Sequence, residues 1–144
     1  MATLHLGVND IPYDYKGSEG RSTGDVAEIL EAKYNVMGVF FEVHGQEIAK
    51  HLAEAATDAL ENLLSGAPVP AHPFLSGETE IQKMFGRFLD LKEMDGRAVG
   101  VPTKAALAGV NHRMAHPYAK RDERPSFVDT GLYANSMRAW VDDK

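Results

Sequence analysis

The sequence predicts a single α+β domain in which two or three helices pack on a small, mainly antiparallel sheet, with an extended N-terminal arm and loops. Three features predict this class. The chain has 144 residues, enough for one hydrophobic core and too few for two ordinary ones. Apolar residues recur at helical spacing through the middle of the chain, whereas they alternate with polar residues near both ends. Glycine and proline clusters separate these segments.

The first 24 residues are expected to form an N-terminal arm or short strand followed by a flexible Gly-rich loop, and residues 25–144 the single domain. Weak alternation over residues 3–8 indicates the strand or arm. Glycine-rich turns before a helix can bind phosphate, but this loop has neither a Gly-Lys-Ser/Thr ending nor a long apolar strand before it. A hinge or arm is therefore the preferred interpretation.

Helical periodicity begins near Asp25, which can cap a helix, and continues to residue 64. The clearest amphipathic run covers residues 46–64. If Gly38 and Gly45 only bend the chain, one helix of about 60 Å results, and if they break it there are two. Two helices are favoured.

Gly66 and the prolines that follow it predict the end of this helical region and an extended loop. Ser76 or Thr79 can cap a further helix that ends near Met94, since apolar residues return at helical spacing.

Three short elements are expected after this helix. Thr103 can cap a short helix that continues to His116, where Pro117 closes it. A helical turn over residues 132–136 and a terminal strand over residues 137–141 complete the fold.

Charge is unevenly distributed along the chain, whose net charge is −6. Residues 1–63 hold 11 acids and 4 bases, whereas residues 64–144 hold 10 acids and 11 bases. This balance disfavours general nucleic-acid binding and would allow copies to pair head to tail.

The composition also excludes several classes of protein. Without cysteine, disulfides and thiolate chemistry are excluded. No apolar run approaches the roughly 18 residues of a membrane span, and no secretory signal precedes the domain, so we expect a protein made in a cytoplasm with no membrane partner.

No catalytic or metal site is predicted, and no cofactor. His112 and His116 have the four-residue spacing of zinc ligands on a helix, but Arg113 replaces the glutamate of a hydrolytic helix and no third ligand is evident. Ser126 and Ser136 have no base nearby in the sequence, so a catalytic triad would require tertiary folding that the sequence does not reveal. An enzyme is not expected.

A basic segment interleaved with aromatic residues is the strongest candidate for contact with a partner or with nucleic acid. It comprises His112, Arg113, His116, Lys120, Arg121 and Arg124. Two acids interrupt it, so a partner-facing surface, DNA contact and a solvated loop all stay open as interpretations.

The C-terminal segment 124–141 resembles the C-terminal signature of tailed-bacteriophage neck proteins of the head-tail joining and tail-completion type. The matching residues are Pro125, Thr130, Gly131, Leu132 and Ser136, followed by a strand that ends near Trp140. The amphipathic helix at 46–64 takes the place of the long N-terminal helix of those proteins. The motif itself suits a structural role, because Thr130 can cap the following turn, Gly131 allows a backbone that a side chain would oppose, and Leu132 and Met137 can enter the core.

The resemblance implies a virion structural protein, made in the cytoplasm of a host bacterium, that forms a homo-oligomeric ring at the neck. Its partners would be other copies of itself in six- or twelve-fold symmetry, the portal or connector, and tail-terminator or tail-tube proteins, with non-specific DNA contact in the lumen. One alternative is a tail terminator, tube or baseplate component. An alternative from another class is a small DNA-binding or regulatory protein that uses the basic segment.

Overall fold

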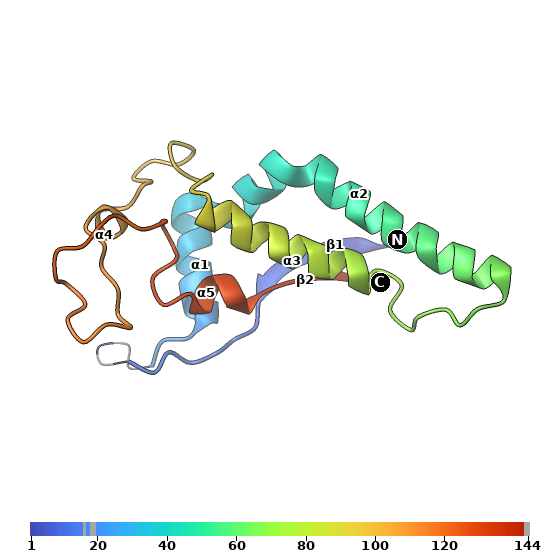
Figure 1. Cartoon of the computed structure of the whole chain (residues 1–144), viewed down its shortest axis with the longest axis horizontal. Helices are drawn as coiled ribbons and strands as arrows, with labels where there is room; N and C mark the ends of the chain where they lie inside the picture. Colours follow the sequence, from blue (N-terminus) through green and yellow to red (C-terminus); the bar gives the residue numbers. More distant parts are fainter. Residues whose placement is uncertain (16, 18–19, 143–144) are drawn as a thin grey trace.

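A two-stranded antiparallel sheet lies against helix α3, and the other helices surround this centre (Figure 1). The structure is a computed structural model that describes residues 1–15, 17 and 20–142. Its elements are β1 (Thr3–Val8), α1 (Thr23–Tyr34), α2 (Val36–Ser65), α3 (Leu75–Asp90), α4 (Lys104–Leu107), α5 (Leu132–Ser136) and β2 (Met137–Asp142). The predicted α+β class is confirmed. The expected Gly-rich loop includes residues 16, 18 and 19, which lie outside the described residues.

The first and last strands of the chain pair with each other. Of the two forms expected for residues 3–8, the structure has the strand, and β1 runs antiparallel to β2 with Leu6 opposite Ala139 and Val8 opposite Met137. Ala139 and Met137 are buried, and Leu6 and Val8 pack against the same core. Because side chains alternate along a strand, the residues between them lie on the opposite face of the sheet.

Helix α3 buries one apolar face in the core, as its periodicity predicts. Its buried side chains include Ile81, Met84, Phe85 and Phe88. Phe40 of α2 lies 5.3 Å from Phe85 and 5.4 Å from Phe88 between ring centroids, and such pairs add about 0.5–1.5 kcal/mol each beyond area burial. The helix ends at Asp90 rather than near Met94, since Lys92 has a left-handed backbone with φ 56°.

The helical region before residue 66 forms two helices, but the expected position of the break is wrong. Gly38 and Gly45 lie inside α2, and the chain turns at Asn35, which has φ 52° and ends α1. The Glu31 carboxylate then accepts hydrogen bonds from the N–H groups of Met37 (2.9 Å) and Gly38 (3.1 Å). A carboxylate at a helix N-terminus is stabilising, so Glu31 fixes the start of α2.

The start of α1 has a capping box one turn earlier than expected. Ser22, rather than Asp25, is the N-cap, and its side chain accepts from the Asp25 N–H while Asp25 accepts from the Ser22 N–H.

Helix α2 extends beyond the N-terminal end of α3. The close approach of the two helices is at Gly77, where an added Cβ would lie 2.8 Å from the carbonyl oxygen of His51. The later residues of α2 therefore project past α3, and Figure 1 shows this end of the helix at one extreme of the long axis. Gly66, at φ 73°, ends α2 as predicted.

The opposite extreme consists mainly of loops between residues 91 and 131 (Figure 1). Thr103 caps α4 as expected, with its hydroxyl accepting from the Ala106 N–H at 3.2 Å. The expected continuation of this helix to His116 is wrong, because it ends at Leu107 and Gly109 follows with φ 67°. Gly109 packs directly on the backbone of Asp122, where no larger residue would fit.

Candidate functional site

The loops at this end are held together by the carboxylate of Asp129. It accepts a hydrogen bond from the His112 N–H at 3.0 Å, it contacts Nδ1 of the His112 ring, and it lies 4.0 Å from Nη2 of Arg124. The sequence offers no signal for this His112–Asp129 pair, since the residues are 17 positions apart. The pair fastens the loop after α4 to the C-terminal motif.

Thr130 and Gly131 form the turn that starts α5. Gly131 has φ 79°, the conformation that the motif predicts, and the Thr130 hydroxyl accepts from the Leu132 N–H at 3.2 Å. Leu132 is half-buried and lies outside the core cluster, whereas Met137 is fully buried, so the expectation of a core position is correct for Met137 alone.

Pro125 and Ser136 take part in the backbone network around this motif. The Pro125 carbonyl accepts from Nη1 of Arg124 at 2.9 Å. Ser136 is buried, and its hydroxyl donates to the Tyr133 carbonyl at 2.8 Å. The Ser136 carbonyl accepts from the Asn9 N–H at 2.8 Å, which joins the motif to the N-terminal segment.

Trp140 lies on the outer face of the sheet and is 45% exposed. Its ring stacks on His5 of the opposite strand with centroids 5.2 Å apart, and the indole covers Gly7, where a Cβ would lie 3.1 Å from it. Trp140 therefore does not belong to the core, and it presents a large aromatic surface on a bare sheet face.

The basic segment divides into residues that hold the loop and residues that face outward. Arg121 donates to the carbonyls of Pro117 (3.1 Å) and His116 (2.6 Å). Arg124 donates to the Val110 carbonyl at 2.5 Å, and burial lowers its pKa from the ordinary value while Asp129 acts in the opposite direction.

The remaining basic side chains are exposed. They are Arg113, His116 and Lys120. His112 and His116 do not share a helix face, because neither is helical. Within residues 1–15, 17 and 20–142, no group of three His, Asp or Glu side chains is arranged to hold a metal ion.

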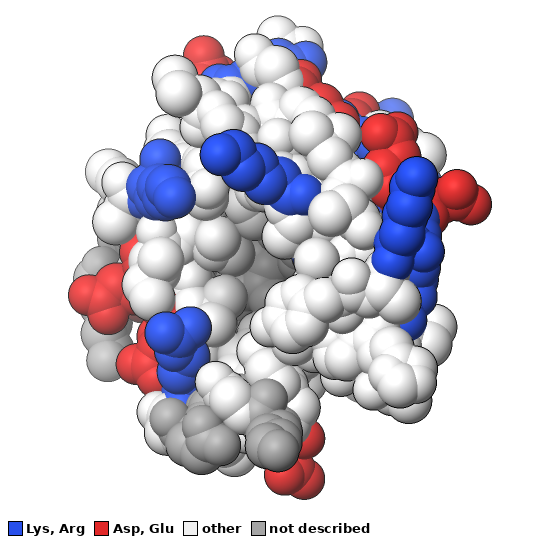
Figure 2. All heavy atoms as spheres, turned by 90° about the vertical axis from the view of Figure 1, so that its left-hand side faces the viewer, with Lys and Arg blue, Asp and Glu red and all other residues white. Residues whose placement is uncertain are grey.

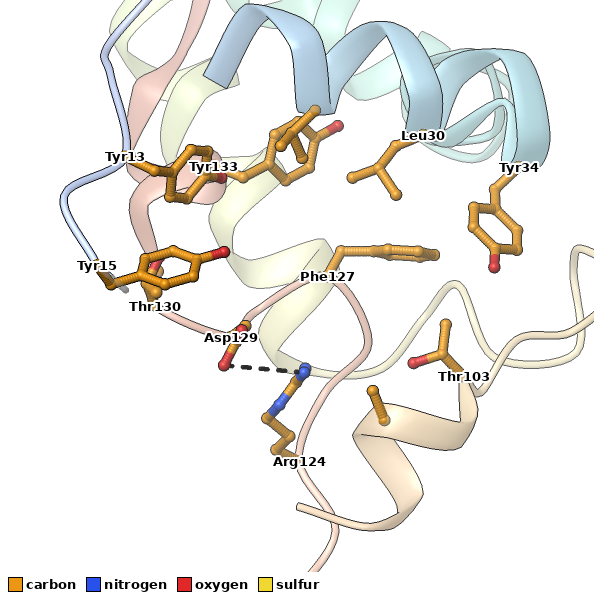
Figure 3. Close-up of a pocket in the computed structure, with 13 residues that line it drawn as sticks. Tyr13, Tyr15, Leu30, Tyr34, Thr103, Arg124, Phe127, Asp129, Thr130 and Tyr133 are labelled. Atoms are coloured by element: carbon orange, nitrogen blue, oxygen red, sulfur yellow. Dashed lines mark ion pairs between the residues drawn. The ribbon is translucent and has the colours of Figure 1, made fainter. Parts of the chain in front are cut away.

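A cavity of about 290 Å³ lies between α1, α4 and the segment 124–131 (Figure 3). Aromatic residues dominate its lining, and Arg124 and Asp129 lie to one side as an ion pair. The lining aromatics are Tyr13, Tyr15, Tyr34, Phe127 and Tyr133. The sequence gives no sign that these residues share a cavity, although the Tyr-Asp-Tyr run after Pro12 is a concentration of aromatics within a loop.

Two of the tyrosines are strongly affected by burial. Desolvation raises the pKa of Tyr13 to about 12, with smaller contributions from Tyr15 and Asp129. Burial also raises the pKa of Tyr133, which is only 3% exposed and whose hydroxyl finds no hydrogen-bond partner among the described residues. Phenols are neutral at pH 7 even at their ordinary pKa, so these tyrosines add no charge to the cavity. Its lining is therefore an apolar, aromatic surface with a few hydrogen-bonding groups.

This end of the molecule is hollowed, and lysine and arginine side chains lie around the hollow, with acidic side chains also present at the periphery of the same face (Figure 2). Residues 97–131 contain six Lys or Arg and three Asp or Glu. An apolar depression with a basic rim is suited to a partner that is apolar at its centre and acidic at its edge.

Comparisons with protein-family models, with curated proteins and with solved structures gave no match for this chain. In the described part of the chain, no helix combines the length and the apolarity needed to span a bilayer.

Proposed function

We propose that this protein is a virion structural protein of a tailed bacteriophage that forms a homo-oligomeric ring at the neck, between the portal or connector and the tail. The observation that carries the proposal is the resemblance of residues 124–141 to the C-terminal signature of phage neck proteins. The ring would have six- or twelve-fold symmetry and would contact tail-terminator or tail-tube proteins.

The geometry of the motif supports this reading. Gly131 needs its left-handed backbone, and Ser136 is buried and joins α5 to the N-terminal segment. The identity of a residue in such a position is required by the surrounding fold. A shared motif of this kind therefore argues for a shared fold more than for a shared reaction.

The exposed apolar surface also supports an assembly role. Trp140 lies on a bare sheet face, and leucines near the end of α2 are exposed, among them Leu64 at 79%. A two-stranded sheet is marginal alone, and neighbouring subunits can pair with its outer edges, except at Val141 of β2, whose N–H already donates to the Glu78 carboxylate of α3 at 2.8 Å. Large exposed apolar patches commonly mark interaction sites.

Immunogold electron microscopy of the phage particles tests the proposal. Antibody against the purified protein is expected to label the junction of head and tail. Label along the tube or at the baseplate would favour the alternative tail roles, and particles without label would contradict a virion role. A non-immune antibody of the same class is the control.

A further inference from the structure

The free end of helix α2 carries an unpartnered apolar stripe. We call residues 54–75 the helix tip. Its leucines at positions 60, 63 and 64 recur at i, i+3 and i+4, so they share one side of the helix. Leu60 and Leu63 are more than half exposed and Leu64 is 79% exposed.

The helix tip is also acidic. It contains three carboxylates and no Lys or Arg. Glu54 pairs with Lys50 and His51 of the preceding turn. Asp58 and Glu61 are exposed and form no ion pair with any residue that the structure describes. At about 100° per residue, Glu61 lies next to Leu64 at the edge of the leucine stripe, whereas Asp58 lies on the opposite side of the helix. The charge of Glu61 is therefore available to a partner that covers the leucines.

The loop end at residues 97–131 has the complementary features. It contains twice as many basic as acidic residues, and Arg113 and Lys120 are exposed. The cavity in this end is lined by apolar and aromatic groups such as Phe127 (Figure 3). Ala105 also lines the cavity and is exposed. Figure 1 shows that the helix tip and the loop end lie at opposite extremes of the long axis.

We propose that the helix tip of one copy docks into the hollow of the loop end of the next copy. The leucine stripe would cover the aromatic lining, while Glu61, at the edge of the stripe, would face the basic rim. Because the two surfaces differ, the contact is heterologous, and such contacts close into a ring when the rotation between copies allows it. The inference rests on the proposed function, for which it supplies the contact between subunits.

Charge favours docking of the helix tip into the loop end over contact between two helix tips. Two tips in contact through their leucine stripes would bring Glu61 of one copy close to Glu61 of another, and like charges across an interface are unfavourable. The loop end offers the opposite charge, and its depression accepts apolar side chains that would otherwise stay in water.

Disulfide trapping tests the contact directly, because the chain has no cysteine of its own. Leu64→Cys and Ala105→Cys are introduced into the same full-length chain, both at exposed positions. Mild oxidation is expected to give a ladder of linked copies on a non-reducing gel. Each single variant is expected to give at most a dimer, and a mixture of the two single variants a 64-to-105 dimer. Lys50→Cys with Ala105→Cys is the control, since position 50 lies about 21 Å back along the helix.

A charge exchange gives a second measurement. Glu61→Lys or Lys120→Glu alone is expected to lower the yield of linked copies about tenfold, and the two together to restore much of it. No ladder, a ladder equal to that of the Lys50 control, or dimers formed by Leu64→Cys alone as efficiently as by the mixture would overturn the proposal.

The two proposals can fail separately. A native oligomer without a 64-to-105 link would refute this contact and leave the neck role intact. A link in a protein that never labels the neck would establish the contact and refute the role.

Discussion

The carboxylate of Asp129 is predicted to stabilise the loop end, and Asp129→Asn tests it. The amide keeps the size of the side chain but removes its charge. It weakens the interactions with the N–H and ring of His112 and leaves the Arg124 guanidinium, only 16% exposed, without its counter-charge. Hydrogen bonds to charged groups contribute about 1.5–3 kcal/mol and neutral ones about 0.5–1.5 kcal/mol. Over two interactions, we expect a loss of about 2 kcal/mol.

Urea unfolding followed by circular dichroism measures this difference as a lower midpoint with an unchanged slope. In thermal unfolding the same loss corresponds to about 4–8 °C for a domain near this size. Asp122→Asn is the matched control, because that side chain is exposed and its carboxylate makes no hydrogen bond or ion pair with the described residues. If Asp129→Asn unfolds within about 0.5 kcal/mol of the control, the assigned role of Asp129 is refuted.

Further predictions concern other parts of the molecule. Trp140→Ala should cost about 1 kcal/mol, mainly the stack on His5, and a cost of 3 kcal/mol or more would place the indole in the core. Gly131→Val should cost about 2 kcal/mol because φ 79° opposes a β-branched residue, and an unchanged urea midpoint would contradict that strain. Tyr13 ionises near pH 10 when unfolded and near 12 when folded, so stability present below pH 10 should fall as the pH rises from 10 to 12. In Tyr13→Phe, the free energy of unfolding measured with urea should decrease less between pH 10 and pH 12 than in the wild type. An equal decrease in the two proteins would count against the burial of this phenol. The purified protein should show no salt-sensitive binding of short duplex DNA, and binding that Arg113→Glu with Lys120→Glu abolishes would favour the DNA-binding alternative.

Local sequence patterns predicted those helices and turns whose formation depends only on residues close together in the chain. The spacing of Ile81, Met84, Phe85 and Phe88 predicted α3, because a buried helix face requires that period. The sequence also predicted the helix end at Gly66, the cap at Thr103 and the turn at Gly131, because each of these residues acts on its own backbone or on that of near neighbours.

Features that depend on contacts between distant residues could not be predicted from local sequence patterns. The break at Asn35 depends on its left-handed backbone and on Glu31 capping the next helix, and the expected break at the glycines was wrong because a helix interior tolerates glycine at about 1 kcal/mol. The loop after α4 is shaped by the packing of Gly109 on Asp122 and by the His112–Asp129 pair, both formed only when the chain folds.

The candidate site, too, could be predicted only in part from local sequence patterns. The sequence identified the basic segment, but only the structure separates Arg121 and Arg124, which hold loop carbonyls, from Arg113 and Lys120, which face outward. The exposure of Trp140 was also hidden, because a strand residue at a given register can face either the core or solvent, depending on which face of the sheet is covered.

Native mass spectrometry of the purified full-length protein is the direct test of the proposed ring at the phage neck. The protein is measured alone and after incubation with detached phage tails or with portal complexes. We expect a six- or twelve-fold species, either alone or on the partner. A monomer that persists with both partners would contradict the proposed ring.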